Sequence, residues 1–253
     1  MTHSATSNTT IVEQNAIINE LRKRAALSRF TIYVLIAISL YNIAEEFVDD
    51  NIFLKNLPHT YFTCTVLSLI TIFAFIMMRK LNLPLSKFGL TLKNLKRHTI
   101  ESLTWTFFVC LLLLLLKWIL ITQISAFSSL RLFDITHTLS ATSITIPYFI
   151  FSFVQVFITQ GALQSSLLEL LEVPNATAIS VFVTTVIFSS IHIDLNMAFA
   201  LAVIPLSIFW CILYNKQRNI ISIGLSHAII GVWALWVLNY IECLKIFSQH
   251  YLS

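Results

Sequence analysis

Long apolar runs recur along the chain and limit its fold more strongly than any other sequence feature. Of its 253 residues, 57% are hydrophobic and 11% are charged, whereas soluble domains carry about 25% charged residues. A helix that crosses a bilayer needs about 20 mostly apolar residues, and no run alternates apolar and polar residues as barrel strands do. The sequence therefore predicts an all-α, polytopic transmembrane helix bundle of about seven spans. The runs lie near residues 30–47, 60–78, 100–124, 145–168, 177–193, 197–214 and 220–241.

Lysine and arginine are unevenly distributed between the apolar runs, and this distribution predicts the orientation of the chain. Twelve of them lie in the N-terminal segment and in the connections at 79–99 and 215–219, whereas the opposite connections hold three. Because cytoplasmic loops of membrane proteins are enriched in Lys and Arg, we predict a cytoplasmic N-terminus. The net charge of +4 follows from this topology, so it indicates the lipid bilayer and no nucleic acid as a partner.

Polar and apolar segments divide the chain into four parts. Residues 1–29 are predicted to form a cytoplasmic segment whose residues 10–26 make an amphipathic helix on the membrane surface. Residues 30–124 are predicted to form the first three spans, and residues 145–241 a core of four helices. A C-terminal tail is predicted at 242–253.

A polar stripe interrupts the apolar run at 145–168. Ser152, Gln155, Thr159 and Ser166 recur at spacings of three, four and seven, which places them on one face of an α-helix. Two interpretations remain open. Such side chains either hydrogen-bond to neighbouring helices, each contributing about 0.6 to 2 kcal/mol, or they line a polar cavity.

Two histidines within later apolar runs favour the cavity. His192 lies one helical turn after Phe188, and His227 is flanked by Gly224 and Gly231, which predicts room beside its imidazole. A single membrane histidine most often makes an interhelical hydrogen bond, but two in neighbouring helices favour a shared cavity. Counting along straight helices places His192 near the outer end of its span and His227 nearer the inner end. A shared cavity therefore requires irregular or tilted helices.

The order of these residues resembles the CPBP family of intramembrane endopeptidases, the group of CAAX prenyl proteases and bacteriocin-processing proteins. Its motifs are Glu-Glu-x-x-x-Arg, then Phe-x-x-x-His, then His-x-x-x-Asn. Here "QVFITQG" takes the first position, Phe188-Ser-Ser-Ile-His192 matches the second, and "SHAIIG", which contains His227, takes the third. The resemblance covers about residues 145–235, and "KFGLTLKN" at 87–94 resembles a loop that is common upstream.

The first and third motifs depart from the family pattern. The resemblance implies that the first glutamate activates the attacking water, that the second-motif histidine helps to hold this water, and that the third-motif histidine and asparagine stabilise the oxyanion. Four of the six polar motif positions are substituted in this chain, by Gln155, Val156, Gln160 and Gly231. The two positions that are retained are His192 and His227.

These substitutions remove the charged chemistry of the motifs. An amide cannot accept a proton near neutral pH, so position 155 lacks a general base, which typically contributes about 10² to 10⁴ in rate. The donor missing at Gly231 removes roughly another 10² to 10³. Replacing both the acid and the arginine by glutamine avoids leaving one buried charge unpaired. We interpret Gln155 and Gln160 as residues that preserve a polar cavity.

The leading hypothesis is a degenerate family member in a bacterial-type plasma membrane that binds a peptide or lipidated protein without cutting it. The resemblance implies roles such as bacteriocin immunity or the regulation of membrane proteins. We expect Ser152, Thr159, Phe188 and Asn196 to contact the bound chain. One alternative is an active, divergent endopeptidase that uses the two histidines. Another is a small transporter or assembly subunit whose polar stripe is structural and whose histidines lie on different faces.

No cofactor is predicted. The one metal alternative is a zinc site made of His192, His227 and Asp194, and no HExxH or comparable spacing supports it. Asp194 and Asn196 instead favour the start of a helix, because Asp and Asn are common N-cap residues.

Overall fold

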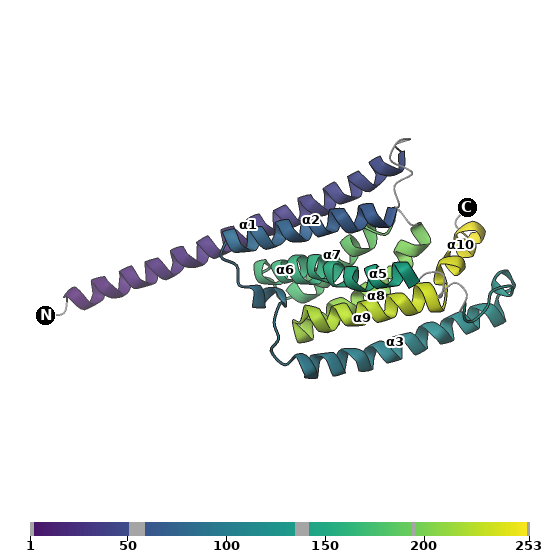
Figure 1. Ribbon diagram of the computed structural model, residues 1–253. Coiled ribbons are helices and arrows are strands. Elements are labelled where there is room, and N and C mark those ends of the chain that lie inside the picture. Colours follow the sequence, from purple (N-terminus) through teal and green to yellow (C-terminus); the bar gives the residue numbers. More distant parts are fainter. Residues whose placement is uncertain (1–2, 51–58, 135–141, 194–195, 252–253) are drawn as a thin grey trace.

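The computed structural model describes residues 3–50, 59–134, 142–193 and 196–251, which are mainly helical and contain no β-strand (Figure 1). The predicted all-α class is confirmed. The helices are α1 (His3–Asp50), α2 (His59–Lys80), α3 (Leu95–Gln123), α5 (Thr142–Val156), α6 (Ser165–Leu170), α7 (Ala176–Ser190), α8 (Met197–Gln217), α9 (Ile220–Val232) and α10 (Tyr240–Tyr251). The shorter elements are the 3-10 helices η1 (Leu85–Phe88) and η2 (Ser125–Phe127) and the π-helical segments η3 (Phe157–Gln164) and η4 (Trp233–Val237).

Five stretches of the described residues are long and apolar enough to cross a membrane, which indicates a multi-pass membrane protein. They are Glu13–Ala44, Leu95–Gln123, Thr145–Leu170, Met197–Gln217 and Ile220–Val237. α7 is apolar but has only 15 residues, about 22 Å at 1.5 Å per residue, against a hydrocarbon core of about 30 Å.

The helices lie side by side, and consecutive ones run back and forth through the bundle (Figure 1). α1 and α2 pack together on one side, and α3 packs on α9 on the other, with α5 to α8 between them. The core contains large side chains from distant parts of the chain, such as Phe30, Met78 and Tyr214, all fully buried. On α3, large apolar residues such as Phe107 and Leu112 are about 60% exposed, as expected of a surface that faces lipid.

α1 is one continuous helix of 48 residues, so the boundary predicted at residue 29 is not a break in structure. Residues 3–50 contain neither Gly nor Pro, and the helix therefore passes from the polar segment into the apolar run without interruption. The amphipathic helix predicted at 10–26 is the first part of this helix, which projects beyond the ends of its neighbours (Figure 1).

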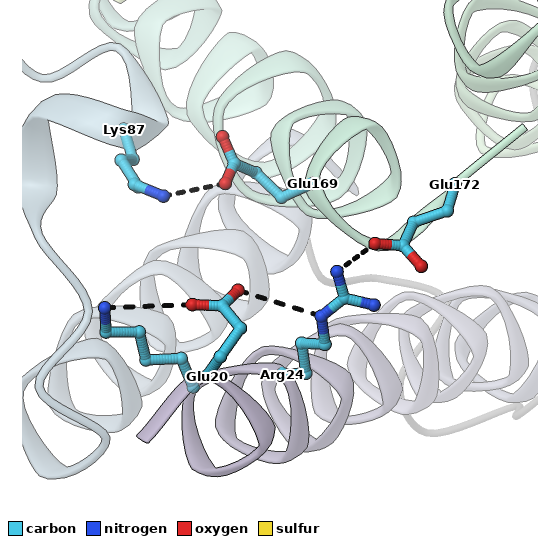
Figure 2. Close-up of polar contacts among 6 residues, drawn as sticks. Glu20, Arg24, Lys87, Glu169 and Glu172 are labelled. Carbon is cyan, nitrogen blue, oxygen red and sulfur yellow. Dashed lines mark hydrogen bonds and ion pairs between the residues drawn. The ribbon is translucent and has the colours of Figure 1, made fainter. Parts of the chain in front are cut away.

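At this end of the bundle one ion pair joins α1 to the segment that follows α6, and another joins η1 to α6. Figure 2 shows the Arg24 guanidinium at the Glu172 carboxylate, and Nζ of Lys87 2.7 Å from Oε2 of Glu169. Glu20 lies 3.7 Å from Nε of Arg24 on the same helix. Exposed pairs of this kind contribute little individually, so they orient the segments they join more than they hold the fold together.

The helix predicted at 145–168 contains a π-helical segment. In η3 the backbone is wider than in an α-helix, and the N–H of Ser165 reaches back to the carbonyl of Gln160, five residues earlier. The 3.6-residue period that assigned Ser166 to the polar stripe therefore does not hold across η3. Segments of this type are frequent at functional sites.

The last apolar run does not form a single helix to residue 241. α9 passes into η4, the chain turns at Asn239, where φ is 46°, and α10 begins at Tyr240. The predicted tail at 242–253 thus lies mostly within a helix. Lys117, buried within α3, donates to the carbonyl oxygen of Leu238 and so satisfies a backbone group that the turn leaves without a helical partner.

Candidate functional site

A cavity of about 550 Å³ opens between α3, α8, α9 and α10, and we call it the His cavity because His192 and His227 both line it. Most of its lining is apolar and comes from residues such as Leu113 of α3 and Leu206 of α8. Phe188 and Gly231, two further motif positions, also line it. The shape and chemistry suit an apolar ligand with few polar groups.

His192 lies just after the end of α7. Its Nδ1 is 2.8 Å from the carbonyl oxygen of Phe188. Because a carbonyl oxygen only accepts, Nδ1 carries the proton, and in the neutral imidazole Nε2 is the acceptor. The backbone carbonyl of Phe188, the first residue of the second motif, therefore fixes the tautomer of His192.

His227 lies within α9 and is held by aromatic rings. Its imidazole stacks on Trp210 with the ring centroids 4.2 Å apart and meets Phe188 edge-on at 5.6 Å. The residue is only 4% exposed, and its Nδ1 has no hydrogen-bond partner among the described residues. Phe188 also lies 4.9 Å from His192, so both imidazoles contact the same phenyl ring.

The shortness of α7 explains how the two histidines meet. In straight, full-length spans, the two histidines would lie at different levels along the bundle axis. α7 ends at Ser190 after 15 residues, and the chain turns there before α8 begins at Met197. His192 is therefore level with the middle of α9, where His227 lies.

The substituted positions of the first motif do not line the His cavity. Val156 is buried in the main hydrophobic core, and Gln155 is 9% exposed with an Oε1 that has no partner among the described residues. Nε2 of Gln160 donates to Sγ of Cys211 at 3.7 Å, which joins η3 to α8. Gln160, which is not part of the polar stripe, thus serves helix packing.

Three of the four residues expected to contact a bound chain are engaged in local hydrogen bonds. The hydroxyl of Ser152 donates to the carbonyl of Tyr148, and that of Thr159 donates to the carbonyl of Gln155 at 2.7 Å. Oδ1 of Asn196 accepts from the backbone N–H of Phe199 at 2.7 Å and caps α8. Asn196 therefore does not continue the face of His192, because the helix has already ended.

The space that the two glycines beside His227 leave is filled by aromatic rings, so the glycines themselves do not provide the predicted room beside its imidazole. A Cβ added at Gly224 would lie 2.5 Å from the ring of Phe153, and one added at Gly231 would lie 1.9 Å from the hydroxyl oxygen of Tyr148. Aromatic side chains of α5 therefore fill both gaps. Close packing of α5 against α9 requires a residue without a side chain at each position.

Sequence reasoning missed Tyr148 and Trp210, which also line the cavity. Tyr148 lies four residues before Ser152, so extending the polar stripe by one turn would have included it. Trp210 lies in a continuous apolar run and gave no comparable signal.

The described residues that line the His cavity include neither aspartate nor glutamate. Within the described part of the chain, no three His, Cys, Asp or Glu residues are arranged to hold a metal ion. Asp194, the third ligand of the zinc alternative, lies outside the described residues.

Comparison with known proteins agrees with the motif order. Residues 149–233 match the family model described as Type II CAAX prenyl endopeptidase Rce1-like. No curated protein and no solved structure matched the chain. The matched segment runs from α5 to the first residue of η4 and contains both His192 and His227. Over this segment the chain is similar to the CPBP family of membrane proteases, the group of the CAAX prenyl endopeptidases.

Proposed function

We propose that this CAAX-protease-like membrane protein binds a peptide or lipidated chain in the His cavity and does not cleave it through a carboxylate-activated water. One observation carries the proposal: the cavity is largely apolar and holds two imidazoles, while the amide at position 155 lies away from its lining. A water-activating base must lie within hydrogen-bond reach of the reacting group. Gln155 has neither that position nor the proton affinity.

The shared cavity favours this proposal over a small transporter or assembly subunit. In the latter case the two histidines would lie on different faces of the bundle. Instead both contact Phe188 in one cavity. The family resemblance supports bacteriocin immunity or the regulation of a membrane protein as the setting in which such binding is used.

We place the N-terminus in the cytoplasm of a bacterial-type cell and count seven crossings of its plasma membrane. The basic connections at 79–99 and 215–219 lie at the same end of the bundle as the N-terminus, and α10 lies at the opposite end (Figure 1). Single cysteines at Lys93 and Gln249 of a cysteine-free chain test this topology. A membrane-impermeant maleimide should label the cysteine at position 249 in intact cells, and the one at 93 only after lysis; the reverse pattern contradicts the topology.

The binding test uses a fluorescent peptide whose terminal cysteine carries a farnesyl thioether, added to the full chain in detergent. Val109→Trp fills the cavity from α3, and Leu103→Trp adds the same bulk to an exposed position of the same helix. We expect saturable binding that Val109→Trp weakens about tenfold, since overpacking typically costs about 1 to 3 kcal/mol. Leu103→Trp should bind like wild type. Equal affinities for the two variants would contradict binding in the cavity.

An active endopeptidase is the second candidate, and the tautomer of His192 favours it. Nδ1–H donates to Phe188, so Nε2 is the ring nitrogen that can accept a proton. Mass spectrometry of the peptide after incubation separates the two candidates. Cleavage by wild type that disappears in His192→Ala supports the second, whereas an intact peptide supports the first.

A further inference from the structure

At one edge of the His cavity, Tyr148 of α5 packs directly against Gly231 of α9. A Cβ at position 231 would lie 1.9 Å from the hydroxyl oxygen of Tyr148 and 2.6 Å from Cζ of its ring. The ring is held edge-on against Trp236, with the centroids 4.8 Å apart, and lies 6.4 Å from the ring of His227. The phenol of Tyr148 therefore occupies the space that a side chain of residue 231 would need, and it lines the cavity there.

We propose that the Tyr148 hydroxyl takes the place of a residue-231 side chain as the hydrogen-bonding group of the cavity, where it binds a carbonyl oxygen of the bound chain. The inference rests on the proposed function, because it names the contact that recognises the peptide part of the ligand. A phenol has one O–H donor and remains protonated at neutral pH, so it can donate to a carbonyl oxygen in apolar surroundings.

Three other hydrogen-bond donors in the lining are engaged with the protein, whereas Nδ1 of His227 has no partner among the described residues. The hydroxyl of Tyr240 donates to the carbonyl of Leu113 at 2.6 Å, and Nε1 of Trp210 donates to the hydroxyl of Ser226 at 3.3 Å. The Nδ1–H of His192 is directed to Phe188.

The packing of Tyr148 against Gly231 leaves no space for an asparagine side chain at position 231. Restoring the family motifs by Gln155→Glu, Val156→Glu, Gln160→Arg and Gly231→Asn places new atoms where the Tyr148 phenol lies. Such a variant therefore requires a fifth change at position 148.

The steric part is tested with a cycle of three variants of the full chain in detergent: Gly231→Asn, Tyr148→Ala and the double variant. Gly231→Asn should unfold at a lower temperature than wild type or fail to accumulate, and the added Tyr148→Ala should recover at least half of that loss. Tyr148→Phe is the matched control, because it keeps Cζ at the site of the clash and should not rescue Gly231→Asn. Additive losses in the double variant would overturn the steric interlock.

The recognition part is tested with two competitors of the farnesylated peptide: the unlabelled peptide, and farnesyl methyl thioether, which carries the same lipid without a peptide carbonyl. Tyr148→Phe should weaken the peptide about 2- to 10-fold, the range of one hydrogen bond, and leave the thioether unchanged. Tyr33→Phe removes a phenol outside the cavity and serves as the control.

The outcomes separate this inference from the proposed function. Peptide binding that Tyr148→Phe leaves unchanged, or weakens equally for both competitors, overturns the role of the hydroxyl while the proposed function stands. If wild type binds neither competitor, the proposed function fails and the recognition role fails with it. The variant cycle then still decides whether Tyr148 occupies the place of a residue-231 side chain.

Discussion

At the scale of single residues, several polar side chains of the last four helices serve the backbone more than a ligand. Asn196 and Asn219 both cap helices: Oδ1 of Asn196 accepts from Phe199, and Oδ1 of Asn219 accepts from Ser222 at 3.0 Å. Such caps satisfy N–H groups that have no partner within the helix. Asn196 therefore has a structural role as a helix cap. Its expected contact with a ligand requires a separate test.

Asn196 can be tested by comparing two substitutions. Asn196→Ala removes the cap and should lower the free energy of unfolding by about 1 kcal/mol, whereas Asn196→Asp keeps an acceptor and should change it by less than about 0.5 kcal/mol. Both should bind the farnesylated peptide like wild type. Reversible denaturation in mixed micelles measures the first quantity and fluorescence titration the second. Weaker binding by folded Asn196→Asp would show that the amide itself contacts the ligand.

At the scale of elements, the π-helical segment η3 decides how the polar stripe meets its neighbours. It lies where Gly161 approaches two other parts of the chain. A Cβ there would lie 2.7 Å from Cδ1 of Ile220 and 3.1 Å from the backbone oxygen of Phe88. The segment is thus packed against both η1 and α9, and its wider turn moves Gln164 toward the carbonyl of Cys211, which it contacts at 3.0 Å.

We expect Gly161→Ala to destabilise the protein, although the same substitution usually stabilises a helix. Alanine normally stabilises a helix by about 1 kcal/mol relative to glycine. At this position the methyl group meets the backbone of Phe88, so we expect a loss of about 1 to 3 kcal/mol. Combining it with Ile220→Val, which removes Cδ1, should recover part of the loss. Thermal unfolding of the three variants measures this, and a stabilised Gly161→Ala would mean that η3 can move away.

At the scale of the whole molecule, the ion pair between Arg24 and Glu172 couples α1 to the segment that follows α6. The hydrogen bond and the charge of Arg24 hold the pKa of Glu172 below its ordinary value of 4.5. A carboxylate with a lowered pKa in the folded state stabilises the contact above its unfolded pKa and loses this effect as the pH falls through the folded pKa. The attachment of α1 at this end is therefore weakest in acid and at high salt.

Spin labels at Glu13 and Val173 test this coupling. The distance distribution between them should broaden as the pH falls from 6 to below Glu172's folded-state pKa, because protonated Glu172 no longer attracts Arg24. In Arg24→Gln the distribution should already be broad at pH 6 and change little with pH. A pH-independent distribution in wild type would show that apolar packing alone positions this part of α1.

The sequence by itself determined the membrane character, the helical class, the family segment and the pair of histidines, because hydropathy and motif order are properties of neighbouring residues. Only the tertiary structure decided where the helices are irregular and what fills the space between them. The short α7 brings His192 level with His227, and the packing of α5 on α9 places the Tyr148 phenol against Gly231. Positions 148 and 231 are 83 residues apart, and a contact between them depends on how two helices pack rather than on the pattern of either one.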